Sequence, residues 1–586
     1  MLLLISALFI SRCARVGAPP GGPKDEDPPK VKKSTPENYS INFDKKTIKV
    51  EFDEYVLLKE VNQKLIVSPP LEDKPNVKLK GKSMIIEIEE ELHDSTTYTF
   101  NFNDAIVDNN ESNPLADYQF VFSTGQVLDS LKYGGGIIDA FNLKVPEEVH
   151  VLMYDDLSDS VLYKKRPLYV SKADENGNFL IQNLKADTFQ IFALQDANMN
   201  FLYEPEEFVA FSDSLIFLNP ESQTEFVMFD STNVVSDSLN VIPDSLDAML
   251  KFSGEKLMLP LFQEEFKEQY VLNSSRTRKE NILFVFNKPL SEDLEISLPE
   301  YSDKKDWFQQ EKYTLGDSIG YWLTDTTLIN QESIQIAFRY LVEFKPDSIK
   351  YVADTIRFRF KKPAKKTRRR NVQPEQKQSL ALLMNIGPGN PIDLNGPVTI
   401  SALTPISHFD VEKIQFYSIH DSVETKVEIS PFKDSTKINR LLFQYKWDEE
   451  YSYKLQFLPE AVTDIYGLTN DSIKVNFQPR KLEYYGNIIM EMENIDKQLI
   501  IQLLTEKEVL IQQSLVSGDT TLSYTYLPPK TYIIKAIWDK NNNRKWDTGN
   551  LIKRIQPEKV SYYLEEIKLR SNWDFKKNWS PQFNDY

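Results

Sequence analysis

The chain has 586 residues, several times the size of an ordinary domain, so several domains in a row are expected. Its formal net charge of -18 repels phosphates, which excludes nucleic acid as an expected partner. Aromatic residues make up 12% of the chain against only 19 glycines, a composition that favours packed strands and predicts an all-β class. The single cysteine excludes an internal disulfide, so stability must come from packing.

That cysteine, Cys13, follows an apolar run from Leu2 to Ile10, which is too short to cross a bilayer but long enough for the core of a signal peptide. A buried strand with an incidental thiol is the alternative. The Pro/Gly-rich segment that follows at once favours the signal, and the arrangement resembles a bacterial lipoprotein signal. The resemblance implies acylation of Cys13 and anchoring in outer-membrane lipid, facing the cell surface or the periplasm. Residues 14–30 are then expected to form an extended tether.

Residues 31–125 contain strand-like runs that alternate with a period of two and have one apolar face. Four segments resemble the bacterial Ig-like domain of the S-layer type: Ser34–Asn38, Val50–Glu54, Thr97–Phe100 and Ala105–Asp108. The resemblance implies a β-sandwich over the whole of this region.

Residues 130–230 predict a different β-sandwich, with four expected strands at 135–140, 149–154, 178–184 and 188–194. The runs Ala173–Phe179 and Thr188–Ile191 resemble the prealbumin or carboxypeptidase-regulatory type of module, which implies a spacer or binding unit. Residues 231–268 mix proline and acidic residues with a few apolar ones and are expected to form a linker that packs partly on its neighbours.

Both kinds of module recur. Thr97–Phe102 is echoed by Ser452–Phe457, and Thr188–Asp196 matches Thr531–Asp539 without a gap. The chain is therefore expected to carry a second Ig-like domain at 379–480 and a second prealbumin-like sandwich at 483–570. Three further regions complete the expected organisation: a weaker Ig-like sandwich at 269–361, a basic linker at 362–378 and an aromatic tail at 571–586.

Two loops carry oxygen-bearing side chains at the spacing with which a calcium loop wraps its ion. The candidate ligands are Asp196, Asn198, Asn200, Glu204 and Glu207 in the first loop, and Asp539, Asn541, Asn543 and Asp547 in the second, with Asn550 at its twelfth position. Position six is Phe201 or Arg544, where a calcium loop has glycine. The alternative to calcium is that these residues form side-chain turns between two strands.

No catalytic residues are predicted, because the four histidines lie in no recognisable motif and no phosphate loop or metal signature is present. The basic run 361–370 is expected to be a solvated linker, with an anionic partner as the alternative. Trp573 and Trp579 are the candidates for an exposed aromatic contact.

These observations predict a non-enzymatic outer-membrane lipoprotein that serves as a binding or scaffold subunit, accessory to a barrel machine for barrel assembly, secretion or import. The alternative is a glycan-binding surface lipoprotein, and a cryptic glycan-active enzyme comes third. Calcium is the one cofactor that the sequence suggests.

Overall fold

The computed structural model describes residues 26–204, 206–220, 257–265, 269–299, 306–313, 316–345, 348–360 and 379–583. Strands dominate, and three short α-helices appear in the described ranges: α1 (Val61–Lys64), α2 (Val161–Lys164) and α4 (Thr326–Asn330). The predicted all-β class is confirmed. The chain divides into two compact units, one of 1–264 with 548–557 and 584–586, the other of 265–547 with 558–583. In these described ranges, no helix combines the length and the apolar character needed to span a membrane.

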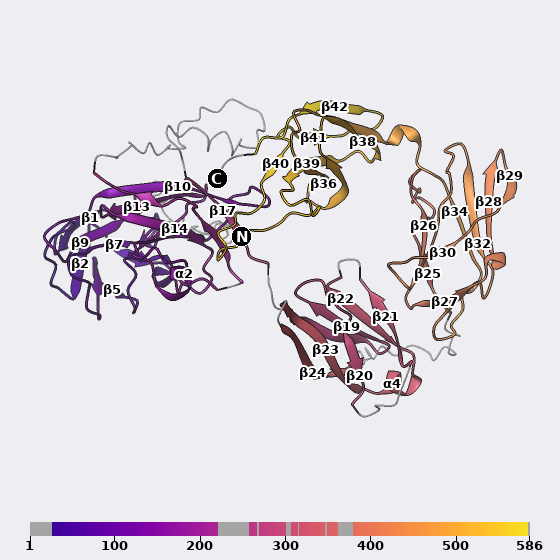
Figure 1. Cartoon of the computed structure of the whole chain (residues 1–586), viewed down its shortest axis with the longest axis horizontal. Helices are drawn as coiled ribbons and strands as arrows, with labels where there is room; N and C mark the ends of the chain where they lie inside the picture. The colour runs from indigo at the N-terminus through magenta and orange to yellow at the C-terminus, as the bar shows by residue number, and fades with distance from the viewer. Residues whose placement is uncertain are drawn as a thin grey trace, which may run out of the picture. The chain divides into compact units, whose positions relative to one another are not determined.

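The first domain is a β-sandwich (Figure 1). Its strands are β1 (Val31–Thr35), β2 (Thr47–Phe52), β3 (Val56–Leu58), β4 (Ile66–Ser68), β5 (Asn76–Lys80), β6 (Ser83–Glu87), β7 (Thr97–Asn101), β8 (Ile106–Asp108) and β9 (Gln119–Ser123). One sheet has the order β1-β2-β6-β5, the other β4-β7-β9, and β3 pairs with β8. β2 buries Ile48, Val50 and Phe52 and exposes Thr47 and Lys49, as the period of two predicts.

The second module builds one large sheet, in the order β12-β11-β14-β15-β17-β10-β13, with β16 added beside β14. Its strands are β10 (Leu131–Asp139), β11 (His150–Tyr154), β12 (Tyr169–Lys172), β13 (Asn178–Leu184), β14 (Thr188–Leu194), β15 (Phe208–Phe211), β16 (Ile216–Phe217) and β17 (Leu257–Gln263). β17 lies inside the expected linker, so the linker prediction is wrong for this stretch. Its buried Leu259 and Leu261 belong to the module core, and it pairs in parallel with β10.

The third domain, at the predicted 269–361, is again all-β. Its strands are β18 (Val271–Arg278), β19 (Asn281–Phe286), β20 (Glu295–Ser297), β21 (Phe308–Lys312), β22 (Ser318–Leu323), β23 (Ser333–Lys345) and β24 (Ser348–Arg359). The sheets have the orders β18-β19-β22-β21 and β20-β23-β24. Their apolar faces enclose a core that includes Phe284, Tyr321 and Phe338.

The fourth domain repeats the strand pairing of the first. Its strands are β25 (Leu382–Met384), β26 (Val398–Ala402), β27 (Ile406–Phe409), β28 (Ile414–His420), β29 (Val423–Val427), β30 (Phe432–Lys433), β31 (Arg440–Phe443), β32 (Ser452–Phe457), β33 (Val462–Asp464) and β34 (Ile473–Phe477). The order β25-β26-β31-β30 matches β1-β2-β6-β5, and the pair β27-β33 matches β3-β8. The other sheet, β29-β28-β32-β34, adds one strand to the β4-β7-β9 pattern. The echo between Thr97–Phe102 and Ser452–Phe457 falls on β7 and β32, which occupy equivalent positions.

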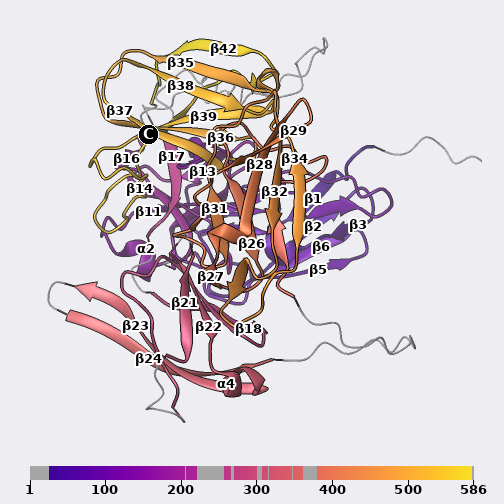
Figure 2. The same ribbon diagram turned by 90° about the vertical axis from the view of Figure 1, so that its right-hand side faces the viewer.

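The fifth module repeats the second strand for strand. Its strands are β35 (Gly486–Met492), β36 (Leu499–Thr505), β37 (Leu510–Val516), β38 (Thr520–Leu527), β39 (Thr531–Trp538), β40 (Val560–Tyr562), β41 (Ile567–Lys568) and β42 (Asp574–Trp579). Its sheets are β38-β35-β42 (Figure 2) and β37-β36-β39-β40 with β41 beside β39. They reproduce the pairings of β10 to β17 except the one between β15 and β17. The expected tail at 571–586 is therefore wrong for β42, which pairs in parallel with β35.

Candidate functional site: the two Asp/Asn loops

The first Asp/Asn loop, Asp196–Glu207, follows β14 and is organised by one carboxylate. Asp196 is only 5% exposed. Its Oδ1 accepts hydrogen bonds from the amides of Asn198 and Met199 at 3.2 and 2.7 Å, and its Oδ2 accepts one from the amide of Phe201 at 2.7 Å. These three bonds hold the backbone as a closed turn around the carboxylate.

The other side chains of this loop converge on two further carboxylates. Asn198 Nδ2 and Asn200 Nδ2 both donate to Glu204 Oε1 at 3.1 Å. The buried Glu207 accepts from the amides of Ala197 and Glu204 at 3.3 and 3.0 Å. The structure thus brings all five predicted side chains of the first loop into one hydrogen-bonded network.

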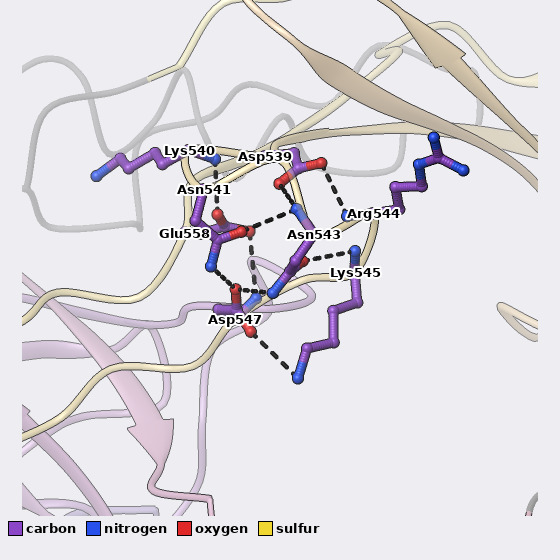
Figure 3. A network of polar contacts seen from close by, with 8 residues as sticks. All are labelled: Asp539, Lys540, Asn541, Asn543, Arg544, Lys545, Asp547 and Glu558. Atoms are coloured by element: carbon purple, nitrogen blue, oxygen red, sulfur yellow. Dashed lines mark hydrogen bonds and ion pairs between the residues drawn. The ribbon is translucent and has the colours of Figure 1, made fainter.

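The second loop follows β39 and repeats this arrangement (Figure 3). Asp539 is 2% exposed. It accepts the amides of Asn543 and Arg544 at 3.0 Å, one on each carboxylate oxygen, and its Oδ2 also accepts Gln498 Nε2 at 2.8 Å. Burial of a carboxylate without hydrogen bonds costs free energy, and the three donors to Asp539 offset this cost.

The two asparagines of the second loop share one acceptor. Asn541 Nδ2 and Asn543 Nδ2 donate to Asp547 Oδ2 at 2.5 and 2.6 Å. The Lys545 ammonium lies 3.5 Å from the other oxygen of the same carboxylate. Figure 3 shows these groups converging on Asp547, which takes the place of Glu204 in the first loop.

Glu558 is a member of this network that the sequence pattern did not indicate. It accepts the amides of Lys540 and Asp547 at 2.7 and 3.2 Å, as Glu207 does in the first loop. Asn550, expected at the twelfth position, lies outside the network, and its backbone pairs with that of Ile555. The closing residue is therefore a buried glutamate in both loops.

Each loop adopts the left-handed backbone conformation at its fourth and sixth positions. The φ angles are 58° and 59° at Met199 and Phe201, and 61° and 68° at Asn542 and Arg544. A calcium loop needs this conformation at position six, where it has glycine. The two loops adopt the same backbone conformation with larger residues. Hydrogen bonds from backbone amides to Asp196 and Asp539 hold this conformation.

Burial shapes the acidity of the closing glutamates. Burial raises the pKa of the Glu207 carboxyl, and the amide hydrogen bonds offset this only in part. Burial likewise raises the pKa of Glu558. Each loop therefore holds a carboxylate that binds a proton more readily than a solvent-exposed glutamate does.

The hydrogen bonds occupy the groups that a cation would use. In each loop the asparagine amide nitrogens, and not the oxygens, face the shared carboxylate. Over the described ranges, no three acidic, histidine or cysteine side chains gather into a group that could hold a metal ion. The structure thus shows the side-chain turns directly, while calcium binding stays a prediction.

The remaining predicted site residues are scattered. Cys13 and the basic run 361–370 lie outside the described residues. Trp573 is 45% exposed, as an aromatic contact requires, whereas Trp579 is 8% exposed and packs in the core of the fifth module. The expectation of an exposed contact at Trp579 is wrong, because the strand period of β42 turns this side chain inward.

The segment Thr548–Pro557, between Asp547 and Glu558, forms a strap that belongs to the first compact unit. Within that unit Arg554 Nη2 donates to Gln190 Oε1 at 2.6 Å. The Arg554 guanidinium lies 5.4 Å from the ring centroids of both Phe192 and Phe211. The strap thus covers aromatic side chains of β14 and β15, and its sequence carried no signal of this role.

Comparison with known proteins supports the Ig-like nature of the first domain. Residues 25–124 match the family model described as a bacterial Ig-like domain. This match spans the segment for which the S-layer-type resemblance was predicted. Comparison with curated proteins gave no match.

Comparison with solved structures gave matches with low identity and low TM-scores. The N-terminal part of the bacterial S-layer protein SbsC is 17% identical over 31% of this chain and 40% of its own, with a TM-score of 0.13. Domains 1–6 of surface layer protein SbsC are 10% identical over 93% and 67%, with a TM-score of 0.14. Native alpha-2-macroglobulin from Escherichia coli is 12% identical over 46% and 93%, with a TM-score of 0.16. Scores this low carry no argument about function.

Proposed function

We propose that the chain is a non-catalytic binding and scaffold subunit, held in outer-membrane lipid through Cys13 and accessory to a barrel machine of the outer membrane. The observation that carries the proposal is the duplicated array of β-domains, each with a filled apolar core. Such arrays display many surfaces and loops, which suits contact between proteins more than chemistry on a small substrate.

The Asp/Asn loops support a structural role in this proposal. Their carboxylates are engaged by backbone amides and asparagine side chains, so they brace the loops. A general acid or base needs its carboxyl group directed toward a reacting atom. These groups are directed at backbone amides and asparagine side chains of the loops themselves.

Purification tests the proposal. The full-length protein, carrying an affinity tag, is extracted from outer membranes in mild detergent and the bound proteins are identified by mass spectrometry. Recovery of a barrel protein in stoichiometric amount is expected. Recovery of the lipoprotein alone contradicts the accessory role. The matched variant Cys13→Ser is expected to leave the membrane fraction, and membrane retention of this variant argues against the lipid anchor.

We also propose calcium as a weak ligand of the two loops, on the evidence of ligand spacing and the left-handed positions. Binding requires the asparagine side chains to turn their oxygen atoms toward the ion. Added calcium is expected to raise the melting temperature, and the rise is expected to vanish in Asp196→Ala with Asp539→Ala. Asp496→Ala, whose side chain is 81% exposed, is the control. A wild-type melting curve that calcium leaves unchanged excludes the site.

Glycan binding is the second candidate, favoured by the exposed Trp573. Its ring lies nearly perpendicular to that of Phe575, with the ring centroids 6.0 Å apart, and the residue is 45% exposed. Stacking on a sugar requires such an exposed ring. Trp307, Trp322 and Trp447 are buried, so these three tryptophans offer no ring surface on which a sugar could stack. A glycan array on which the wild-type protein binds and Trp573→Ala does not supports this candidate, and an array without binding rejects it.

A further inference from the structure

The outer strand β37 presents an open edge in the fifth module (Figure 2). Within the described part of the chain it pairs only with β36. Leu510, Ile511 and Leu515 are 50%, 42% and 44% exposed. The strand therefore offers both unpaired backbone groups and apolar side chains to solvent.

This edge lacks the charges that usually protect an open strand. Residues 510–516 contain no charged residue, whereas the outer strands β5, β29 and β42 carry lysines at Lys78, Lys426 and Lys576. Lysine on an edge strand discourages pairing with another chain. An uncharged, apolar edge favours such pairing.

The equivalent strand in the second module shows what can cover this position. β12 lies against β4 of the first domain, inside the same compact unit. Tyr169 and Val170 are only 4% and 5% exposed, and the Val170 amide donates to Ser68 Oγ at 3.1 Å. In the first copy of the module this strand is thus shielded by a strand of another domain, whereas its counterpart β37 is exposed.

The sequence of β37 is complementary to itself in an antiparallel arrangement centred on Gln513. Ile511 then faces Leu515, and Gln512 faces Ser514. Leu510 lies opposite Val516, whose side chain is buried in the core of its own module. The exposed apolar residues therefore meet each other, and amides meet polar groups.

We propose that two copies of this chain associate through their β37 strands, which pair antiparallel about Gln513 and join two sheets across a twofold axis. The symmetric pairing gives an isologous interface, in which the same surface serves both partners. A bulge in β37 opposite Leu503 and Leu504 increases the local twist and keeps the contact short. A strand pair of this size predicts a weak, concentration-dependent dimer.

Cysteine crosslinking tests the register. The full-length Cys13→Ser chain, which has no other cysteine, receives Gln513→Cys and is oxidised in mild detergent. Facing positions in an antiparallel pair are close enough for a disulfide, so a covalent dimer is expected. A mixture of the Ile511→Cys and Leu515→Cys chains is expected to crosslink several-fold more than either alone. Equal crosslinking in all three samples, or no more than in the exposed control Leu564→Cys, overturns the proposal.

Sedimentation tests the association itself. The full-length Cys13→Ser chain is expected to shift from monomer to dimer as its concentration rises. Leu515→Lys and Ile511→Lys are each expected to abolish the shift, whereas Leu564→Lys, at a residue 76% exposed elsewhere in the module, is not. Circular dichroism checks that each variant is folded. A monomer at every concentration overturns the proposal, as does a dimer that both lysine variants leave intact.

Discussion

Asp196 and Asp539 show how one buried side chain can organise a whole loop. Their positions could be predicted from the sequence, because an acidic residue followed by asparagines at the third and fifth positions is a local pattern. Glu558 could not be predicted in this way. The closing glutamate comes three residues after Glu204 in the first loop but eleven after Asp547 in the second, because the strap 548–557 intervenes.

Removal of the Asp539 carboxylate is expected to destabilise the fifth module strongly. Asp539→Ala leaves three buried or partly buried donors without their acceptor, and we expect a loss of about 3 kcal/mol in the free energy of unfolding. Chemical unfolding of the full chain, combined with hydrogen exchange of β39, measures the loss. The exposed Asp496→Ala serves as the control, and a loss below about 1 kcal/mol contradicts the assigned role.

His150 is expected to make the second module sensitive to mild acid. Burial lowers the pKa of its imidazole, although the negative charge of Asp196 raises it in part, and its Nδ1 has no hydrogen-bond partner among the residues that the structure describes. Because the folded pKa lies below 6.5, the ordinary value for histidine, the folded state loses stability as pH falls through 6.5 toward the folded pKa. The loss is at most about 1.4 kcal/mol per pH unit.

Hydrogen exchange of β11 and β14 between pH 7 and pH 5 checks this expectation, after correction for the intrinsic pH dependence of exchange. His150→Phe removes the titrating group and keeps an aromatic ring beside Phe201, whose centroid lies 5.6 Å from the imidazole. The variant is expected to flatten the pH dependence. An equal loss of protection in wild type and variant would falsify the role of His150.

At the scale of elements, strands with a clear period of two were predictable, whereas two strands at equivalent positions were not. The sequence predicts a linker at β17 and a tail at β42, yet these strands occupy the same position in the two copies of one module. Both pair in parallel with the first strand of their module, so their partners are distant in sequence. Pro260 in β17 and the charged residues in β42 also weaken the local strand pattern.

The two tryptophans of the predicted tail are expected to differ sharply. Trp579→Ala removes a buried ring that packs against Tyr563 at 5.9 Å, and we expect a loss of about 3–5 kcal/mol. Trp573→Ala changes a half-exposed ring and is expected to cost less than about 1 kcal/mol. Chemical unfolding followed by fluorescence measures both, and similar losses in the two variants contradict the burial of β42.

The strap is expected to protect aromatic side chains of the second module. Arg554→Ala removes the bond to Gln190 and the cation over Phe192 and Phe211, and we expect a loss of about 1–3 kcal/mol. Faster hydrogen exchange in β14 and β15 of the full chain is the expected signature. Lys553→Ala, at an exposed neighbour, is the matched control, and equal exchange in the two variants counts against the strap.

At the scale of the molecule, the duplication could be predicted because two pairs of segments repeat in the sequence. The division into compact units could not, since it depends on the strap, which joins residues 548–557 to the unit of 1–264. No local pattern reports an association between segments so far apart. The likeness of the second and fifth modules to prealbumin stays a prediction.

The two compact units are expected to respond separately to a core mutation. Phe122 is fully buried and stacks on Phe43 at 3.9 Å, and Phe122→Ala is expected to cost the first unit about 3–5 kcal/mol. Calorimetry of the full Phe122→Ala chain is expected to show the transition of the first unit shifted to lower temperature and that of the second unit unchanged. Leu455→Ala, in the core of the second unit, is expected to shift the second transition and leave the first unchanged. A uniform shift of all transitions contradicts the division.

The parallel pairing of the last strand in each module also sets the order in which the strands can pair while the chain is being synthesised. Hairpins such as β36 with β37 join segments that leave the ribosome close together, whereas β42 arrives last. Until then one side of β35 lacks its final neighbour, and pairing that spans a long stretch of chain is slow. Each module therefore passes through an interval in which it is nearly complete but still exposes an unpaired strand edge. We expect chaperones to act on β10 and β35, the strands that wait for these last neighbours.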